Sequence, residues 1–201
     1  MAGGRLYVID GPDGAGKTTQ AARVATCLRE RGREVLVLRE PGGTPVGEAI
    51  RDVLLDPDTD LTATAEMMLY QAARAQLVEA VVRPALEAGT DIVLDRFTYS
   101  TVAYQAFGLG LDADAVRQVA ELVTGGLKPQ RVFILDLDPE TGLERLQGGR
   151  DRIEGRPLDF HRRVREGFLA EAARLGEGAV VVDATRSVDD VTQAILSQVE
   201  P

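Results

Sequence analysis

The stretch from residue 11 to residue 18 constrains the fold and chemistry of this chain more than any other. It reads Gly-Pro-Asp-Gly-Ala-Gly-Lys-Thr, which fits the phosphate-loop pattern of Gly, four residues, and Gly-Lys followed by Ser or Thr. The apolar run before it predicts a buried strand and the residues after it predict a helix, as such a loop requires. A glycine-rich turn that binds nothing has no use for the Gly-Lys-Thr ending. We therefore expect a nucleoside-triphosphate site formed by Gly11, Pro12, Asp13, Gly14, Ala15, Gly16, Lys17, Thr18 and Thr19.

Strand and helix signals alternate along the whole chain, which predicts one α/β domain over residues 1–201 with a mainly parallel sheet. Neither a linker nor a repeat interrupts this order. The expected strands are residues 6–9, 34–38, 92–94, 131–137 and 180–182. The expected helices are residues 19–31, 45–55, one long amphipathic helix over 61–87 with a bend before Pro84, a helix ending near 107, 112–123, and helices starting at 139, near 158 and after 187.

Composition excludes several classes of partner. The net charge of −9 argues against broad binding of nucleic acids or anionic membranes, and no apolar run approaches the ~18 residues that span a bilayer. The single cysteine rules out an internal disulfide and suits a reducing cytoplasm. The chain contains no asparagine, so the Asn-Lys-x-Asp motif by which GTPases bind guanine is absent. We expect a cytoplasmic protein that binds small molecules.

The predicted strand ends carry many of the polar residues. In open parallel sheets, ligands bind beyond the carboxyl ends of the strands. The segments that fall there are residues 10–18, Arg39-Glu40-Pro41, Asp95-Arg96, Asp138 and Asp183-Ala184. We expect these segments to surround one site.

Asp95 and Arg96 are the strongest candidates at these ends after the phosphate loop. A carboxylate in the position of Asp95 holds Mg²⁺, directly or through water, together with the Thr18 hydroxyl, but many strands also end in an Asp that caps a helix. These two interpretations of Asp95 carry equal weight. The guanidinium of Arg96 suits a phosphate in the crevice, and the alternative is a salt bridge to Asp95.

Two predicted helices carry further candidates. Tyr70 and Arg74 lie four residues apart on one face, where they could stack on a base and hold a phosphate, although such a pair is more often surface packing. The helix after Arg96 presents hydroxyl and amide groups that suit a base edge or a sugar. These groups belong to Ser100, Thr101, Tyr104 and Gln105.

An arginine-rich segment over about residues 147–157 is predicted to form a lid. It carries Arg150, Arg152 and Arg156 between glycines. A lid excludes water, and its arginines would neutralise the charge that develops on a transferred phosphoryl group. The alternative is a solvated surface loop. The only histidine, His161, is not needed for phosphoryl transfer, and we interpret it as a surface residue of a helix.

These residues resemble the bacterial thymidylate kinases. The similarity covers the chain from about residue 5 to residue 199, and the phosphate loop alone would be shared with many proteins. The more specific segments are Arg-Glu-Pro-Gly-Gly-Thr at 39–44, Ala-Ala-Arg-Ala-Gln at 72–76, Asp-Arg-Phe-Thr-Tyr-Ser at 95–100 and Asp-Arg-Ile-Glu at 151–154. The resemblance implies a five-stranded parallel nucleoside-monophosphate kinase fold, in three layers with helices on both faces of the sheet. It also implies the reaction MgATP + dTMP → ADP + dTDP and a homodimer formed through helices.

The resemblance also implies roles for individual residues. Asp13 would approach the acceptor sugar and the metal-bound phosphates, Arg96 would bridge the donor and acceptor phosphates, and Arg145 would pack on adenine. Lys17, Arg96, Asp13 and the three lid arginines would act in the transfer. The dTMP-binding set would be Asp13, Arg39, Pro41, Arg51, Tyr70, Arg74, Arg96, Ser100, Thr101, Tyr104 and Gln105.

One departure from the family sharpens the expectation for the lid. Ala15 occupies a loop position where some family members carry a basic residue, and members without it place that charge in the lid. Three alternatives stay open on the sequence alone. They are a kinase for another nucleoside monophosphate, a nucleotide-binding switch or regulatory ATPase, and a binding module without catalysis.

Overall fold

A parallel five-stranded sheet in the order β2-β3-β1-β4-β5 forms the centre of the protein, as predicted. The computed structural model describes residues 3–146 and 151–199. Each inner strand pairs in parallel with both neighbours, and Val8 of β1 pairs with Leu94 of β3 on one side and Val132 of β4 on the other. The strands are β1 (Leu6–Asp10), β2 (Val35–Arg39), β3 (Asp91–Asp95), β4 (Arg131–Asp136) and β5 (Ala179–Asp183).

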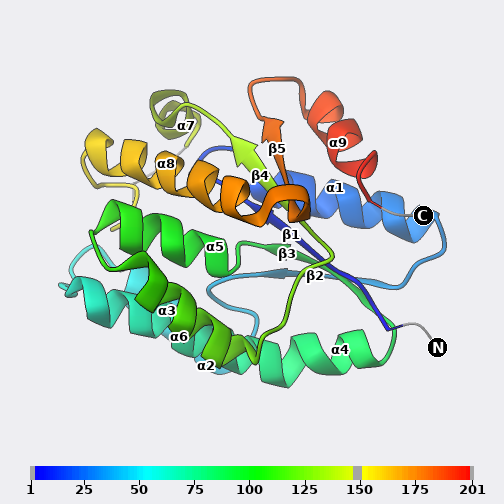
Figure 1. Ribbon diagram of the computed structural model, residues 1–201, viewed down its shortest axis with the longest axis horizontal. Coiled ribbons are helices and arrows are strands. Elements are labelled where there is room, and N and C mark those ends of the chain that lie inside the picture. Colours follow the sequence, from blue (N-terminus) through cyan, green and yellow to red (C-terminus); the bar gives the residue numbers. More distant parts are fainter. Residues whose placement is uncertain (1–2, 147–150, 200–201) are drawn as a thin grey trace.

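Helices cover both faces of the sheet, which gives three layers. Successive strand residues point to opposite faces, so Leu6 and Val8 enter one core cluster and Tyr7 and Ile9 enter the other. The first cluster packs under α3, α8 and the helical segment 98–108, and the second packs under α1 and α9, which lie side by side near the C-terminus (Figure 1). The helices are α1 (Lys17–Glu30), α2 (Pro45–Leu55), α3 (Ala63–Leu77), α4 (Arg83–Glu87), α5 (Thr98–Thr101), α6 (Ala113–Thr124), α7 (Pro139–Arg145), α8 (Leu158–Leu175) and α9 (Val188–Leu196).

Two predicted helices contain wider turns that the sequence pattern does not reveal. The segment predicted as one helix over 61–87 continues from α3 through a π-helical stretch, Val78–Val82, into α4, so its geometry changes just before Pro84. The helix predicted to end near 107 consists of α5 and a second π-helical stretch, Val102–Gly108. Such wide turns often occur at functional sites. The second stretch carries Tyr104 and Gln105, both predicted site residues.

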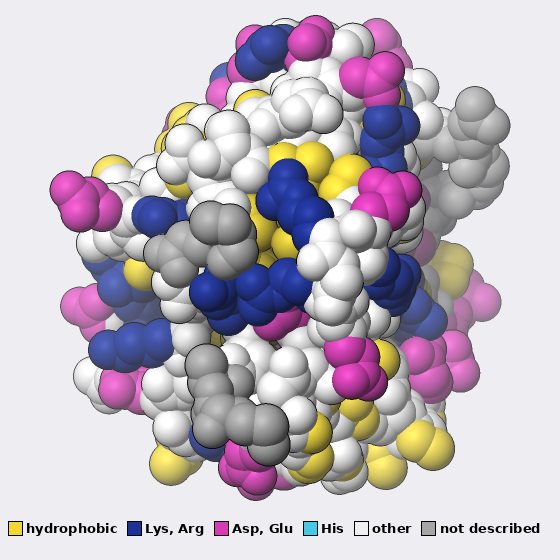
Figure 2. Space-filling view, turned by 90° about the vertical axis from the view of Figure 1, so that its right-hand side faces the viewer, with side chains coloured by type: hydrophobic (Ala, Val, Ile, Leu, Met, Phe, Trp, Pro, Cys, Tyr) yellow, Lys and Arg dark blue, Asp and Glu magenta, His cyan; other side chains and the backbone are white. Residues whose placement is uncertain are grey.

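Because all five strands run in the same direction, they begin on one side of the molecule and end on the opposite side. Both chain termini lie on the side where the strands begin (Figure 1). Lys and Arg side chains gather in a band on that side (Figure 2), so the charge of −9 is not spread evenly over the surface. Among the described residues, no helix is long and apolar enough to cross a membrane.

Candidate active site

The phosphate loop joins β1 to α1 through glycines in backbone conformations that other residues rarely adopt. Gly11, Gly14 and Gly16 have positive φ angles of 141°, 74° and 87°. A Cβ on Gly14 would also lie 2.0 Å from the carbonyl oxygen of Gly142 in α7. The loop therefore takes its shape from glycine, and its end coincides with the start of α1 at Lys17.

Lys17 lies almost fully buried at the start of α1. Its ammonium donates a hydrogen bond to the carbonyl oxygen of Pro12 at 2.6 Å, which folds the side chain back over the loop. Burial lowers the pKa of Lys17 to about 8, and the nearby positive charge of Arg96 adds to this effect. An anionic neighbour stabilises the charged form of a lysine whose pKa is lowered, so a phosphate bound in the loop would favour the protonated ammonium of Lys17.

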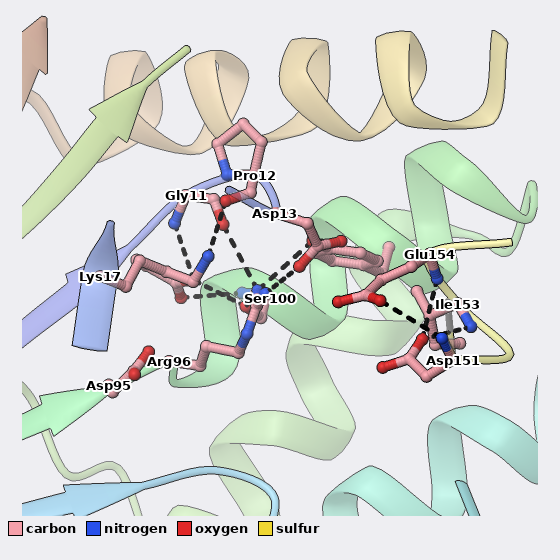
Figure 3. Close-up of polar contacts among 12 residues, drawn as sticks. Gly11, Pro12, Asp13, Lys17, Asp95, Arg96, Ser100, Asp151, Ile153 and Glu154 are labelled. Atoms are coloured by element: carbon pink, nitrogen blue, oxygen red, sulfur yellow. Dashed lines mark hydrogen bonds and ion pairs between the residues drawn. The ribbon is translucent and has the colours of Figure 1, made fainter. Parts of the chain in front are cut away.

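Arg96 and Asp13 point toward each other between the loop and α5 (Figure 3). Arg96 forms an ion pair with Asp13 and donates to Ser100 Oγ at 3.1 Å and to the carbonyl oxygen of Gly11 at 3.3 Å. The Tyr104 hydroxyl donates to the second Asp13 oxygen at 2.7 Å. Arg96 is also the one non-glycine residue with a positive φ, 69°, among residues 3–146 and 151–199. Such strain in a non-glycine residue is often found at functional sites.

Asp10, at the end of β1, organises this region although we did not predict a role for its side chain. It is fully buried and accepts hydrogen bonds from the backbone of Gly11, Phe97 and Ser100 and from the Ser100 hydroxyl at 2.6 Å. The carboxylate thus binds the start of the phosphate loop and the start of α5 at once. Its position at the end of a buried strand was the available signal.

The two predicted metal ligands lie in contact. The Thr18 hydroxyl donates to Asp95 Oδ2 at 2.6 Å. Asp95 does not cap α5, because the backbone N–H groups of Phe97 and Ser100 at the start of that helix donate to Asp10. Arg96 forms its ion pair with Asp13 and not with Asp95. Both alternative interpretations of the Asp95–Arg96 pair are therefore absent from the described structure.

A cavity of about 420 Å³ opens between the phosphate loop, the strand ends and the segment 151–154. Most predicted site residues line it, including the loop, the residues of α5 and the π-helical stretch, Tyr70 and Arg145. The lining residues are Asp13, Gly14, Gly16, Lys17, Thr18, Thr19, Arg39, Glu40, Pro41, Arg51, Leu55, Tyr70, Asp95, Arg96, Ser100, Thr101, Tyr104, Gln105, Arg145, Leu146, Asp151, Ile153 and Glu154. The acidic residues Asp151 and Glu154 were not predicted to line it.

Several predicted residues lie outside this lining. Asp138 caps α7 and Asp183 binds Thr185, so neither strand end reaches the cavity. The loop residues Gly11, Pro12 and Ala15 also do not line it, although they shape the loop that does. Arg150 lies outside the described residues.

Arg74 supports the cavity wall from behind. Its guanidinium is 1% exposed and binds Glu40 Oε2 at 2.7 Å, Gln71 Oε1 at 2.7 Å and Thr101 Oγ1 at 2.9 Å. Burial raises the pKa of Glu40, and the positive charge of Arg74 opposes that rise. Through these contacts Arg74 holds two lining residues, Glu40 and Thr101, in place. Its direct contact with dTMP stays a prediction.

The described lid arginines bind a carboxylate. Arg152 and Arg156 approach Glu66 Oε2 of α3 at 2.7 and 2.5 Å. Glu66 is 0% exposed, and its other oxygen accepts from Gln105 at 2.8 Å. We did not predict Glu66, although it lies four residues before Tyr70 on the face that carries Tyr70 and Arg74.

The interpretation of His161 as a surface residue is wrong. The side chain is 4% exposed, and its ring packs edge-on against Phe160 with centroids 5.2 Å apart. His161 lies three and seven residues before Val164 and Phe168, which are core residues of α8, so helical spacing places it on the buried face. Burial lowers its pKa, while backbone hydrogen bonds to residues 154 and 156 of the lid oppose that change.

The phosphate loop lies at the carboxyl edge of a parallel sheet with the strand order 2-3-1-4-5, and an arginine-bearing segment borders the same cavity. This combination defines a nucleoside-monophosphate kinase. The thymidylate kinase family model matches residues 9–195. The chain belongs to the thymidylate kinase family.

Individual relatives extend this match over nearly the whole chain. The thymidylate kinase of Deinococcus radiodurans is 47% identical over 99% of this chain and 98% of its own length. That of Chlorobaculum tepidum is 42% identical over 97% of this chain and 96% of its own length. The crystal structure of thymidylate kinase from Ehrlichia chaffeensis covers 97% of this chain and 98% of its own with a TM-score of 0.82 at 28% identity.

Proposed function

We propose that this chain transfers the γ-phosphoryl group of ATP to dTMP and forms ADP and dTDP. The observation that carries the proposal is one continuous cavity with a phosphate loop at one end and an aromatic, hydroxyl- and amide-bearing wall at the other. Such a cavity suits two nucleotides that meet through their phosphates. The names of the relatives supply the identity of the acceptor.

The donor half is built around the loop. Its backbone N–H groups and the start of α1 suit the ATP phosphates, and Lys17 supplies a positive charge between them. Arg145 lines the cavity and donates to the carbonyl oxygen of Ala184 at 3.1 Å, which orients its guanidinium for packing on adenine.

The acceptor half faces the loop. Arg39 and Arg51 both donate to the carbonyl oxygen of Pro41, at 3.3 and 3.1 Å, so two positive charges converge near the predicted acceptor phosphate. The Tyr70 ring lines the same wall and can stack on thymine. The hydroxyl and amide groups toward the base and deoxyribose belong to Ser100, Thr101, Tyr104 and Gln105.

Catalysis by positioning and charge stabilisation follows from this arrangement. Arg96 lies between the loop and α5 in a strained backbone conformation, where its fork can bridge the two phosphates. Asp13 and Tyr104 hold that fork in place before any substrate binds. In-line attack by a dTMP phosphate oxygen then needs no general base, because the nucleophile is already anionic.

The Thr18 hydroxyl and the Asp95 carboxylate would hold Mg²⁺. Their contact and chemistry fit that ion, which usually takes few protein ligands beside phosphates and water. The ion would neutralise charge on the β- and γ-phosphates.

ADP release in the presence of each monophosphate in turn tests this function. We expect rapid release with dTMP, and at least about tenfold less with dUMP, CMP or AMP. Lys17→Ala should abolish turnover, since it removes the buried charge from the loop. Equal rates with and without an acceptor would instead identify an ATPase, and faster turnover of another monophosphate would reassign the substrate.

We also propose a cytoplasmic homodimer that buries the outer faces of α2 and α3. These adjacent helices expose Val46, Val53 and Met68, which supports an apolar contact between two copies. Light scattering at micromolar concentration should give twice the mass of 21.6 kDa, and a monomer would contradict the dimer.

A further inference from the structure

A single buried carboxylate connects the lid to the wall of the acceptor cavity. Glu66 of α3 is 0% exposed. Its Oε2 binds Arg152 at 2.7 Å and Arg156 at 2.5 Å, while its Oε1 accepts from Gln105 at 2.8 Å. The two arginines lie on either side of the lid residues Ile153 and Glu154, and Gln105 lines the cavity. One side chain thus contacts both the predicted lid and the wall of the cavity.

The electrostatics make the lid position depend on Glu66. The side chains of Arg152 and Arg156 are only 10% and 16% exposed, so solvent screens their mutual repulsion weakly. Without a carboxylate between them, two guanidiniums would be buried side by side unpaired, which is strongly unfavourable. With it, the cluster keeps one net positive charge at the root of the lid.

Other contacts orient the lid but do not replace this one. The backbone N–H and the Nε of Arg152 donate to the carbonyl oxygens of Leu55 and Leu54 at 3.3 and 2.8 Å. Ile153 is 6% exposed and belongs to a core cluster. These contacts align the segment 151–156 against the end of α2, and among the described residues only Glu66 forms ion pairs with its two arginines.

We propose that Glu66 is a positioning residue that docks the lid over the cavity and, through Gln105, couples lid docking to the base-binding wall. The role rests on the proposed phosphoryl transfer. Arg152 and Arg156 then act as the docking contacts of the lid, and they do not themselves reach the transferred phosphate in the docked state. Occupation of the cavity by dTMP should tighten the lid, because Gln105 and the lid share one carboxylate.

Glu66→Gln is the most direct variant, since it keeps the size of the side chain and removes its charge. Its matched control is Glu171→Gln in α8. Glu171 is 1% exposed and, like Glu66, binds two arginines, Arg117 at 2.6 Å and Arg174 at 2.9 Å. It does not line the cavity. A general effect of an amide facing two guanidiniums appears in both variants, although more weakly in Glu171→Gln because Arg117 and Arg174 are 26% and 46% exposed. Faster cleavage of the lid is expected only in Glu66→Gln.

Limited trypsin digestion without substrates measures lid docking. The bond Arg152–Ile153 is cleavable, whereas Arg156 precedes proline and resists trypsin. We expect Glu66→Gln to be cut after Arg152 at least about tenfold faster than the wild-type chain, because hydrogen bonds to a charged group are lost. Glu171→Gln should be cut at the wild-type rate, and dTMP should slow cleavage of the wild-type chain.

Kinetics provide the second readout. In Glu66→Gln we expect kcat to fall about tenfold to a hundredfold, with a smaller rise in KM for dTMP. Arg152→Met should lower kcat similarly, and Glu66→Gln added to it should cost much less than it does alone, since both act on the same docking contact.

Cleavage and kcat of Glu66→Gln equal to those of Glu171→Gln would overturn the inference, as would full additivity with Arg152→Met. If Glu66→Gln does not fold, cleavage after Arg152 in Arg156→Met decides, because this variant removes one docking contact to Glu66 and keeps the trypsin site. The digestion needs no turnover, so it tests the docking of the lid even if dTMP proves not to be the acceptor.

Discussion

Replacement of Asp13 by Asn tests whether the charge balance that holds Arg96 is as important as the geometry indicates. Asp13 pairs with Arg96 and accepts from the Tyr104 hydroxyl at 2.7 Å. Asparagine has nearly the same shape but retains one acceptor oxygen and no charge. Either Arg96 or Tyr104 therefore loses its acceptor, and Arg96 loses its counter-charge in both cases.

The structure sets the size of the effect. The side chains of Arg96 and Asp13 are 21% and 12% exposed, so water screens the pair only partly. Hydrogen bonds to charged groups at such sites contribute about 1.5–3 kcal/mol, and we expect Asp13→Asn to lower the free energy of unfolding by about 2 kcal/mol at pH 7.5. For a chain of this length that corresponds to a fall in Tm of roughly 4–8 °C.

The pKa of Asp13 determines the pH range in which the Asp13→Asn variant is less stable than the wild-type chain. Burial of Asp13 opposes ionisation, but Arg96 and Lys17 outweigh it and hold the pKa below its usual 3.8. A carboxyl group with a lowered folded-state pKa stabilises the fold above its unfolded pKa, and this contribution is lost as the pH falls through the folded value. The difference between wild-type and Asp13→Asn should stay constant from pH 8 to about pH 5 and shrink only below about pH 4.

Urea unfolding followed by circular dichroism at several pH values measures this difference. The control is Asp189→Asn, because Asp189 is 80% exposed where it pairs with Arg23 and should have almost no effect. Equal stability of Asp13→Asn and the wild-type chain at pH 7.5 would refute the argument. So would a loss that persists unchanged at pH 3.

Two further predictions concern the phosphate loop. Burial, and after it the positive charge of Arg96, lowers the pKa of Lys17 to about 8. Because kcat/KM reports on the free enzyme, kcat/KM for ATP should fall above that pH. A profile that stays flat to pH 9.5 would contradict this. Gly14→Ala should destabilise the fold in urea by more than about 2 kcal/mol, because its Cβ would meet Gly142 and its φ is 74°. Gly32→Ala, with φ 82° but open space around it, should cost only about 1 kcal/mol; equal losses would show that the contact with Gly142 is unimportant.

The order of the elements follows from local sequence, which is why it was predictable. Buried strands such as Asp91–Asp95 have short apolar runs, and helix starts such as Ser187 and Thr44 carry side chains that bind the first turn. The phosphate loop adds a glycine pattern whose spacing admits few conformations. The predicted and observed ends of the strands differ by at most one residue, which lies within the usual uncertainty of element ends.

The polar contacts behind the cavity were less predictable because they join residues far apart in sequence. Glu66 meets the lid across 86 residues or more, and Asp10 meets Ser100 across 90. In an amphipathic helix, a buried glutamate and a solvated one differ only in which face they occupy. The faces of Glu66 and His161 could be read from their spacing, but the arginines that justify burial of Glu66 could not.

Two arginines of the site, Arg74 and Arg96, pair with carboxylates but differ in exposure, which bears on how an acidic chain can receive an anionic substrate. Arg74 is 1% exposed, and its donors are bound to Glu40, Gln71, Thr101 and the backbone of Phe97, so these buried partners hold its guanidinium in one direction. Arg96 is 21% exposed and lines the cavity, so a phosphate can approach it while Asp13 keeps it aimed. Pairing with a carboxylate thus fixes the direction of both guanidiniums in advance, and the larger exposed fraction of Arg96 leaves it open to a substrate.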